Sequence, residues 1–123
     1  MITHDDAHRF AEDWIAAWNA RDLDRILAHY CDDFEMASPV IVSLMSDPCG
    51  VLRGKDAVRT YWSQALARVP NLCFELVGVY AGVESVVILY DGPRGRGAEA
   101  FWLDDAGKVI RAAAHYAEPG AGD

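Results

Sequence analysis

The sequence lacks the basic clusters and long apolar runs that would indicate several common classes of protein. Its formal net charge is −8, with 19 acidic residues against 11 basic ones. An acidic excess argues against binding nucleic acid through its phosphates, which requires clustered Lys and Arg. No apolar run approaches the roughly 20 residues that a membrane-spanning helix needs. We therefore expect no nucleic-acid partner and no membrane partner, and we attribute the charge to solubility.

The sequence also lacks the paired cysteines that a zinc site or a disulfide framework would need. Cys31, Cys49 and Cys73 are odd in number and widely spaced, and no CxxC pair occurs. This pattern argues against a zinc site, and we expect neither a metal nor a cofactor. The first six residues are polar and acidic, unlike a signal peptide. We therefore expect a cytoplasmic protein with free thiols.

The chain does contain a succession of helical patterns in its first half. Its length of 123 residues suits one domain over residues 1–123. The first helix should begin at Thr3, which can cap it with Asp6 as an acid in the first turn. Phe10, Trp14 and Trp18 then recur every four residues as its apolar stripe. Asp22 can cap a second helix. A third helix should follow Gly54 and end at residue 70, a proline.

The apolar pattern changes to a period of two after residue 72, which predicts strands at about 72–81, 83–90, 97–103 and 108–117. An earlier strand pattern around Phe34 is stopped by Pro39. Residues 40–53 show no regular period, and we expect them to form an irregular apolar flap over the core. Three helices followed by an antiparallel meander predict the α+β fold class.

The predicted strands are apolar on both of their faces. Val86 and Ile88 alternate with Val87 and Leu89, whereas a sheet with one wet face should alternate apolar with polar residues. Three helices can cover only one face, so the other face needs a partner. We expect a homodimer formed through this outer sheet face, on which the parity of the last strand also places His115.

Four segments of the chain carry a resemblance to a known superfamily. They are WIAAWNARDLD at residues 14–24, YCDDF at 30–34, LRGKDAV at 52–58 with the aromatic pair Tyr61 and Trp62, and FWLDDAGKV at 101–109. Together they resemble the nuclear transport factor 2-like superfamily, most closely its SnoaL-like proteins and more distantly ketosteroid isomerase. The resemblance implies a cone in which the helices and a curved sheet enclose a pocket for a small, mostly apolar molecule. It does not specify an activity, because this fold hosts isomerases, cyclases, dehydratases and non-enzymatic binding domains.

The ketosteroid isomerase site can be carried over position by position. The resemblance implies a tyrosine on the first helix, an aspartate base before a proline and a protonated acid in a late strand. These positions hold Trp14, Ser38 and Glu99 here. Two of the three groups are therefore replaced, and a steroid isomerase that uses the same base is not expected.

Glu99 is the main candidate for a catalytic residue. Its strand parity matches that of Phe101, so both side chains should face the helices. A carboxyl group in an apolar pocket resists ionisation, which raises its pKa and lets it donate or move a proton. The alternative is that Glu99 lies at the open end of the strand and pairs with an arginine, namely Arg53, Arg94 or Arg96.

Tyr116 is the second catalytic candidate, because its phenol could donate a hydrogen bond to a ligand carbonyl. Ser38 could orient the ligand through its hydroxyl, or could serve simple turn chemistry before Pro39. The remaining pocket candidates are aromatic or apolar side chains: Trp14, Trp18, Tyr30, Phe34, Met36, Tyr61, Trp62, Val86, Ile88, Phe101, Ala112 and Ala114. Aromatic rings at helical spacing are more often plain core, which is the alternative for these residues.

Two classes of function fit these residues. The first is a cofactor-independent isomerase, cyclase or dehydratase that moves a proton with Glu99. The second is a domain that binds or senses a hydrophobic metabolite without chemistry. The missing tyrosine and aspartate favour the second class, whereas a carboxyl group inside the pocket favours the first.

Overall fold

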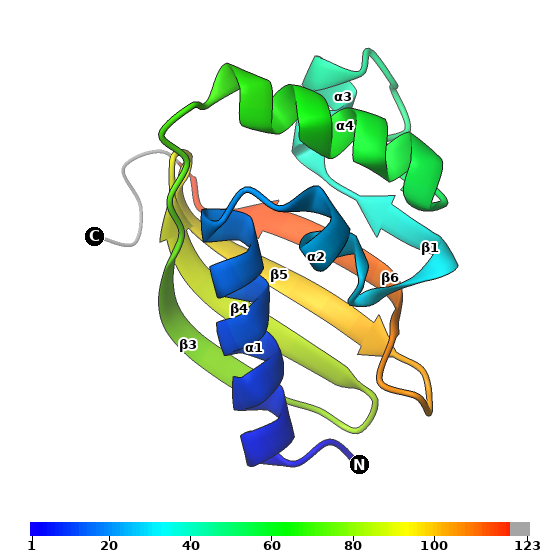
Figure 1. The fold of residues 1–123 in the computed structure, drawn as a ribbon, viewed down its shortest axis with the longest axis vertical. Coiled ribbons are helices and arrows are strands. Elements are labelled where there is room, and N and C mark those ends of the chain that lie inside the picture. The colour runs from blue at the N-terminus through cyan, green and yellow to red at the C-terminus, as the bar shows by residue number, and fades with distance from the viewer. Residues whose placement is uncertain (119–123) are drawn as a thin grey trace.

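Over residues 1–118 the fold is α+β, with four helices on one face of a curved six-stranded sheet that does not close into a barrel (Figure 1). The computed structural model describes residues 1–118, and the last five residues of the predicted domain lie outside that range. Within the described residues, no helix is both long and apolar enough to cross a membrane. The predicted fold class is confirmed, but the structure differs from the prediction in the segment 40–53 and in the pairing of the first and last strands.

The first two helices begin at the predicted caps. The Thr3 hydroxyl accepts a hydrogen bond from the backbone N–H of Asp6, at 3.0 Å, where α1 (His4–Asn19) begins. The Asp22 carboxylate caps α2 (Leu23–Leu27) in the same way. These side chains satisfy backbone donors that the first turn of a helix leaves free, which is why a local sequence signal located both starts.

The segment after the first strand is more regular than its sequence indicates. Residues 40–53 were predicted to be irregular, which is wrong, because they contain most of α3 (Pro39–Leu44) and the short strand β2 (Val51–Arg53). The Ser38 hydroxyl accepts a hydrogen bond from the N–H of Val40, at 3.1 Å, and proline suits the first helical position. A helix of six residues has too few turns to produce a visible period.

The sheet contains one pairing that the order of the strands did not reveal. Its spatial order is β2-β1-β6-β5-β4-β3. The remaining elements are β1 (Tyr30–Ala37), α4 (Lys55–Arg68), β3 (Glu75–Ala81), β4 (Ser85–Gly92), β5 (Gly95–Leu103) and β6 (Val109–Tyr116). The four-strand meander from β3 to β6 is antiparallel as predicted, but its last strand returns to lie parallel to β1. The sheet is therefore mixed rather than wholly antiparallel.

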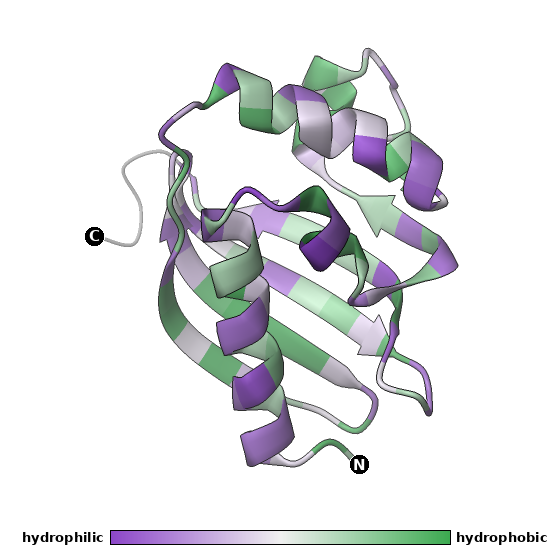
Figure 2. Cartoon of the chain, viewed as in Figure 1, coloured by the Kyte–Doolittle hydropathy of each residue, from purple (hydrophilic) through white to green (hydrophobic). Residues whose placement is uncertain are grey.

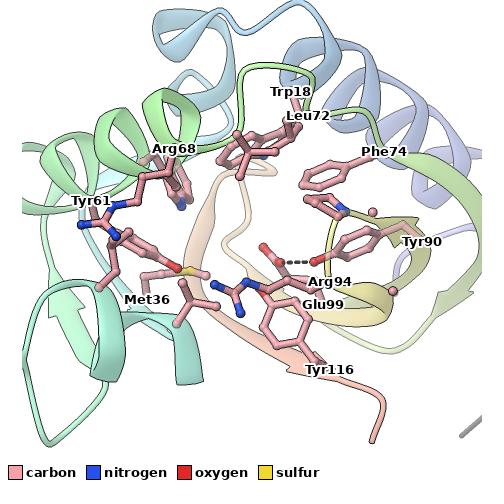
Figure 3. A pocket seen from close by; sticks show the side chains of 18 of the residues that line it. Trp18, Met36, Tyr61, Arg68, Leu72, Phe74, Tyr90, Arg94, Glu99 and Tyr116 are labelled. Carbon is pink, nitrogen blue, oxygen red and sulfur yellow. Dashed lines mark hydrogen bonds between the residues drawn. The ribbon is translucent and has the colours of Figure 1, made fainter. Parts of the chain in front are cut away.

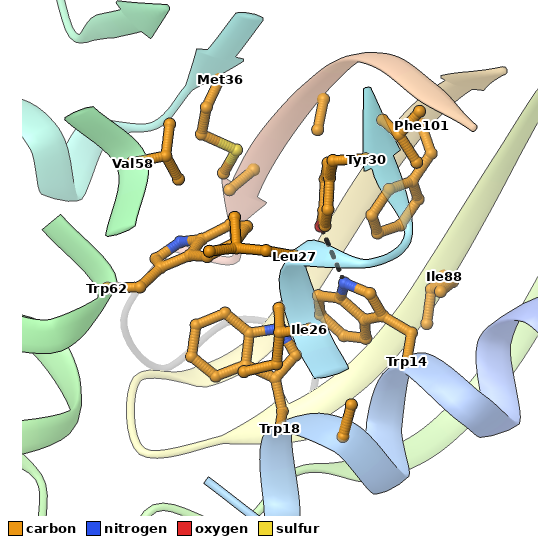
Figure 4. Packing of buried hydrophobic residues seen from close by; sticks show 14 of the residues in the cluster. Trp14, Trp18, Ile26, Leu27, Tyr30, Met36, Val58, Trp62, Ile88 and Phe101 are labelled. Atoms are coloured by element: carbon orange, nitrogen blue, oxygen red, sulfur yellow. Dashed lines mark hydrogen bonds between the residues drawn. The ribbon is translucent and has the colours of Figure 1, made fainter. Parts of the chain in front are cut away.

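The inner face of the sheet packs against the helices to form the core. Val86 and Ile88 are fully buried on β4, as their parity predicts, beneath the apolar side of α1. Figure 2 shows hydrophilic residues along the exposed side of α1 and hydrophobic stretches on β3 and β4. In the core the indole N–H of Trp14 donates a hydrogen bond to the Tyr30 hydroxyl, at 3.0 Å (Figure 4). Aromatic side chains therefore link the first helix to the first strand in the core.

The outer face of the sheet carries no helix (Figure 1). Tyr80 is 59% exposed there, and Trp102 is half-buried beneath the guanidinium of Arg111, 4.6 Å from the ring centroid. His115 is exposed on this face, as its parity in the strand predicts. Its Nδ1 atom lies 3.2 Å from the carbonyl oxygen of Ala98. This face is accordingly mixed in character, with apolar and aromatic side chains beside charged ones.

Candidate functional site

A cavity of about 220 Å³ lies between the helices and one end of the sheet (Figure 3). It is smaller than the roughly 300–1,000 Å³ typical of drug-sized sites, so a small ligand would fill it. Seven of its 20 lining residues are aromatic and come from distant parts of the chain: Trp14 and Trp18 from α1, Tyr61 and Trp62 from α4, Phe74 before β3, Tyr90 from β4 and Tyr116 from β6. Trp14 and Phe74 stack face to face, with ring centroids 5.7 Å apart. The wall therefore offers flat apolar surfaces to a ligand.

Glu99 is the one carboxyl group among the cavity-lining residues that the structure describes. It lies on the inner face of β5, is 4% exposed, and has Ala114 beside it on β6. The Tyr90 hydroxyl donates a hydrogen bond to its Oε1 at 3.3 Å (Figure 3). The small side chain of Ala114 leaves the carboxyl group room to face the cavity.

The alternative placement of Glu99, in an ion pair with an arginine, is not what the structure shows within residues 1–118. Arg53 pairs with Glu35, and Arg96 pairs with Asp91. Arg94 lines the cavity but forms no ion pair with a described residue. Glu99 is thus a buried carboxyl group held by a phenol rather than neutralised by a cation.

Burial sets the protonation of this site. Burial raises the pKa of Glu99 to about 7, although the hydrogen bond from Tyr90 acts in the opposite direction. Near neutral pH the protonated and charged forms of this carboxyl group are therefore both populated. Burial also raises the pKa of Tyr61 to about 12 and that of Tyr116 above its usual range. The phenols consequently remain protonated and can donate hydrogen bonds.

A glycine allows Tyr90 to reach Glu99. Gly97 pairs with Tyr90 on β4 and with Tyr116 on β6, so it sits between two tyrosines in one row of the sheet. A Cβ atom on Gly97 would lie only 3.0 Å from the Cζ atom of Tyr90, closer than normal packing allows. The missing side chain lets the Tyr90 ring lie over the neighbouring strand, where its hydroxyl meets the carboxyl group.

The structure brings about half of the predicted site residues to the cavity wall. These are Trp14, Trp18, Met36, Tyr61, Trp62, Glu99 and Tyr116. A second group packs in the core rather than lining the cavity: Tyr30, Phe34, Val86, Ile88, Phe101, Ala112 and Ala114. Phe101 illustrates the reason, since the rings of Phe10 and Trp14 cover it at centroid distances of 5.0 and 5.4 Å. Ser38 is buried and caps α3, as the turn-chemistry alternative proposed.

Thirteen of the 20 wall residues were missed from the sequence, and four of them, Arg68, Phe74, Tyr90 and Arg94, bear on the chemistry of the site. Tyr90 could have been found, because it shares the parity of Val86 and Ile88. Phe74, Arg68 and Arg94 gave no periodic signal: Phe74 precedes its strand, Arg68 ends a helix and Arg94 lies in a turn. Within residues 1–118, no three His, Cys, Asp or Glu side chains are grouped so as to hold a metal ion.

Comparison with known proteins places this geometry in a family. The model of the SnoaL-like domain matches residues 11–116. A SnoaL-like protein of unknown function from Burkholderia thailandensis is 48% identical, with a TM-score of 0.92 over 95% of this chain and 98% of that one. No curated protein matches the chain.

More distant solved structures share the fold alone. AclR, a candidate hydroxylase from Streptomyces galilaeus, is 17% identical with a TM-score of 0.72 over 94% of this chain and 91% of its own. A candidate isomerase of the SnoaL-like family from Agrobacterium tumefaciens is 15% identical, also with a TM-score of 0.72, over 91% and 97%. The family model covers most of the chain and the Burkholderia protein is nearly half identical to it, so this protein belongs to the SnoaL-like family.

Proposed function

We propose that the protein binds a small, mostly apolar carbonyl compound in the aromatic cavity and moves a proton on it without a cofactor. The observation that carries the proposal is the buried carboxyl group of Glu99, which faces an aromatic cavity with a pKa raised to about 7 by burial. A general acid–base catalyst works best when its pKa lies near the working pH. The reaction class is isomerisation, cyclisation or dehydration, in keeping with the candidate isomerase among the structural neighbours.

The residues around Glu99 supply the other parts of a proton transfer. The charged carboxylate takes a proton from the carbon next to the ligand carbonyl, and the electron pair of that C–H bond moves to form an enolate. Tyr116, a protonated phenol in the same cavity wall, donates a hydrogen bond to the enolate oxygen. In a β,γ-unsaturated ketone the enolate is conjugated with the neighbouring C=C bond, so neutral Glu99 returns the proton to the γ-carbon. The double bond moves into conjugation with the carbonyl, and the isomerisation is balanced. Tyr90 holds the carboxyl group in place.

A second function, binding or sensing without chemistry, is favoured by a separate observation. The Ser38 hydroxyl at the position of the usual base is occupied in capping α3, and Trp14 at the position of the usual tyrosine donates its N–H to Tyr30. Neither group can replace what the isomerase site would require, because a serine hydroxyl is too weak a base and the one N–H of the indole is already bonded. The two functions differ in whether the bound ligand exchanges protons with the protein.

Deuterium exchange into small ketones distinguishes these functions. We expect the protein to speed the incorporation of deuterium next to the carbonyl of small cyclic β,γ-unsaturated ketones, measured by proton NMR in D₂O. Glu99→Gln should slow this exchange at least about 100-fold, the usual contribution of general acid–base catalysis. The variant should still bind the ketones, because glutamine has the shape of the neutral acid.

The matched control is Glu75→Gln, an exposed glutamate on β3 that should leave exchange unchanged. Ketones that bind the wild-type protein but exchange no faster than in buffer would support the binding function instead. Failure of every ketone to bind would contradict both.

We also propose that the protein forms a homodimer through the outer sheet face. Four helices cover the inner face, and the outer face presents Tyr80, Val87 and Trp102 to solvent or half-buried. We expect sedimentation at micromolar concentration to give twice the 13.5 kDa of one chain. Val87→Glu should shift the protein to the monomer, because a charge there would be desolvated in the interface. Val83→Glu, in the exposed turn before β4, is the control; a wild-type monomer would refute the proposal.

A further inference from the structure

Two arginines at the cavity have no partner among the described residues. The chain has 11 basic side chains, and within residues 1–118 nine of them bond to an acidic side chain or a backbone carbonyl. The two that do not are Arg68 and Arg94, and both of them line the cavity. In a protein with a net charge of −8, unpaired cations gathered at one opening are not explained by stability.

The backbone around Arg94 is held by several constraints while its side chain stays free. Arg94 lies in the tight turn between β4 and β5, preceded by Pro93 and followed by Gly95, whose φ of +88° suits glycine. Just outside this turn, the Arg96 guanidinium donates to the Asp91 carboxylate at 2.6 Å. The turn therefore fixes the backbone from which the exposed side chain of Arg94 extends, which lowers the backbone entropy lost on binding.

Arg94 faces the polar part of the cavity. Figure 3 shows its guanidinium extending over the cavity near Tyr61 and Tyr116, with Arg68 at the rim beside Tyr61. Burial raises the pKa of both phenols. The positive charge of Arg94 opposes that rise, as expected for a guanidinium that lies near the two hydroxyl groups. Among the described residues that line the cavity, Glu99 is the one acidic residue, and it is buried and bonded to Tyr90, so it does not neutralise the rim.

We propose that the ligand of this cavity carries an anionic oxygen group, a carboxylate or an acidic enol, which Arg94 and Arg68 bind at the opening while the apolar body lies among the aromatic rings. A guanidinium is suited to this role because its N–H groups match the two oxygens of a carboxylate. A positive opening also concentrates anions near an otherwise acidic protein. The inference rests on the proposed function for one point, that the cavity takes a small apolar ligand.

Equilibrium dialysis with two matched probes tests this inference. The probes are 2-naphthoate and its neutral counterpart 2-naphthamide, each measured by its own fluorescence. We expect the wild-type protein at low ionic strength to bind the naphthoate roughly three- to tenfold more tightly than the amide, as for a partly exposed charge pair. The double variant Arg68→Gln/Arg94→Gln should lose this preference and keep its affinity for the amide, which also shows that it is folded.

The control is Arg59→Gln, on the same helix as Arg68 but paired with Asp24 and absent from the cavity wall. It should keep the preference for naphthoate. Equal binding of the two probes by the wild-type protein, or a preference that survives in the double variant, would overturn the inference while leaving the apolar pocket intact. Failure of both probes to bind the wild-type protein would overturn the pocket itself and the inference with it. A salt titration should reduce the preference, because partly exposed charges are screened.

Discussion

Glu99→Gln is expected to make the protein more stable than the wild type at pH 8 and to leave the two nearly equal at pH 4.5. The folded protein raises the pKa of Glu99 from 4.5 to about 7 by burial, so the folded state binds this proton more tightly than the unfolded state. The stability that the carboxyl group contributes is therefore complete below pH 4.5 and is lost as the pH rises through 7. The loss is about 3 kcal/mol at 1.36 kcal/mol for each unit of pKa. Glutamine cannot ionise and escapes it.

The measurement is the free energy of unfolding in urea between pH 4.5 and 8.5, for both proteins at one fixed concentration. The difference between them isolates Glu99, because other titrating groups contribute equally to both. Glu75→Gln, at an exposed position, should differ from the wild type by an amount that does not change with pH. A flat difference for Glu99→Gln would mean that the carboxyl group is well solvated, and the proposed acid–base role would lose its basis.

Trp14→Ala is expected to cost about 3–5 kcal/mol of unfolding free energy, a large part of the total for a small domain. Trp14 is 1% exposed, and its ring contacts four others: Trp18, Phe74, Tyr90 and Phe101. Removing it would empty the junction between α1, the sheet and the cavity wall. Trp14→Phe should cost less, about 1–3 kcal/mol, because it keeps an aromatic ring in the core. The cost that remains comes from the lost hydrogen bond, since the Tyr30 hydroxyl no longer accepts from an indole N–H.

Urea unfolding of both variants measures these costs. Ile15→Ala is a suitable control, because Ile15 lies on the same helix but is only half-buried, and its loss should be smaller. A cost below about 1 kcal/mol for Trp14→Ala would mean that the neighbouring rings close over the vacated space. The comparison also separates the structural role of Trp14 from its place in the wall.

Both predictions concern side chains that lie next to one another between α1 and the inner face of the sheet. The aromatic cluster around Trp14 stabilises the fold and keeps water from the carboxyl group, and the exclusion of water raises the pKa of Glu99. Tyr90 belongs both to the aromatic cluster and to the candidate site, because its ring contacts Trp14 and its hydroxyl binds Glu99. A change in the cluster should therefore alter the titration of the site as well as the stability.

The sequence by itself determined the features that depend on neighbouring residues. The caps at Thr3 and Asp22 follow from side chains that bond to backbone a few residues away. The inward direction of Glu99 follows from the two-residue period of a strand, and so does the outward direction of His115. The resemblance to the SnoaL-like proteins identified the family, and the match to its model confirms it.

The tertiary structure alone decided what depends on residues far apart in the chain. The parallel pairing of β1 with β6 joins the first strand of the chain to the last, so no local period could reveal it. The bond from Tyr90 to Glu99 requires a missing side chain at Gly97, and the presence of Arg68 and Arg94 at one cavity requires a helix end and a turn to lie on the same side of the sheet. Local sequence specifies which way a side chain points from its own strand or helix, whereas packing between elements decides what that side chain meets.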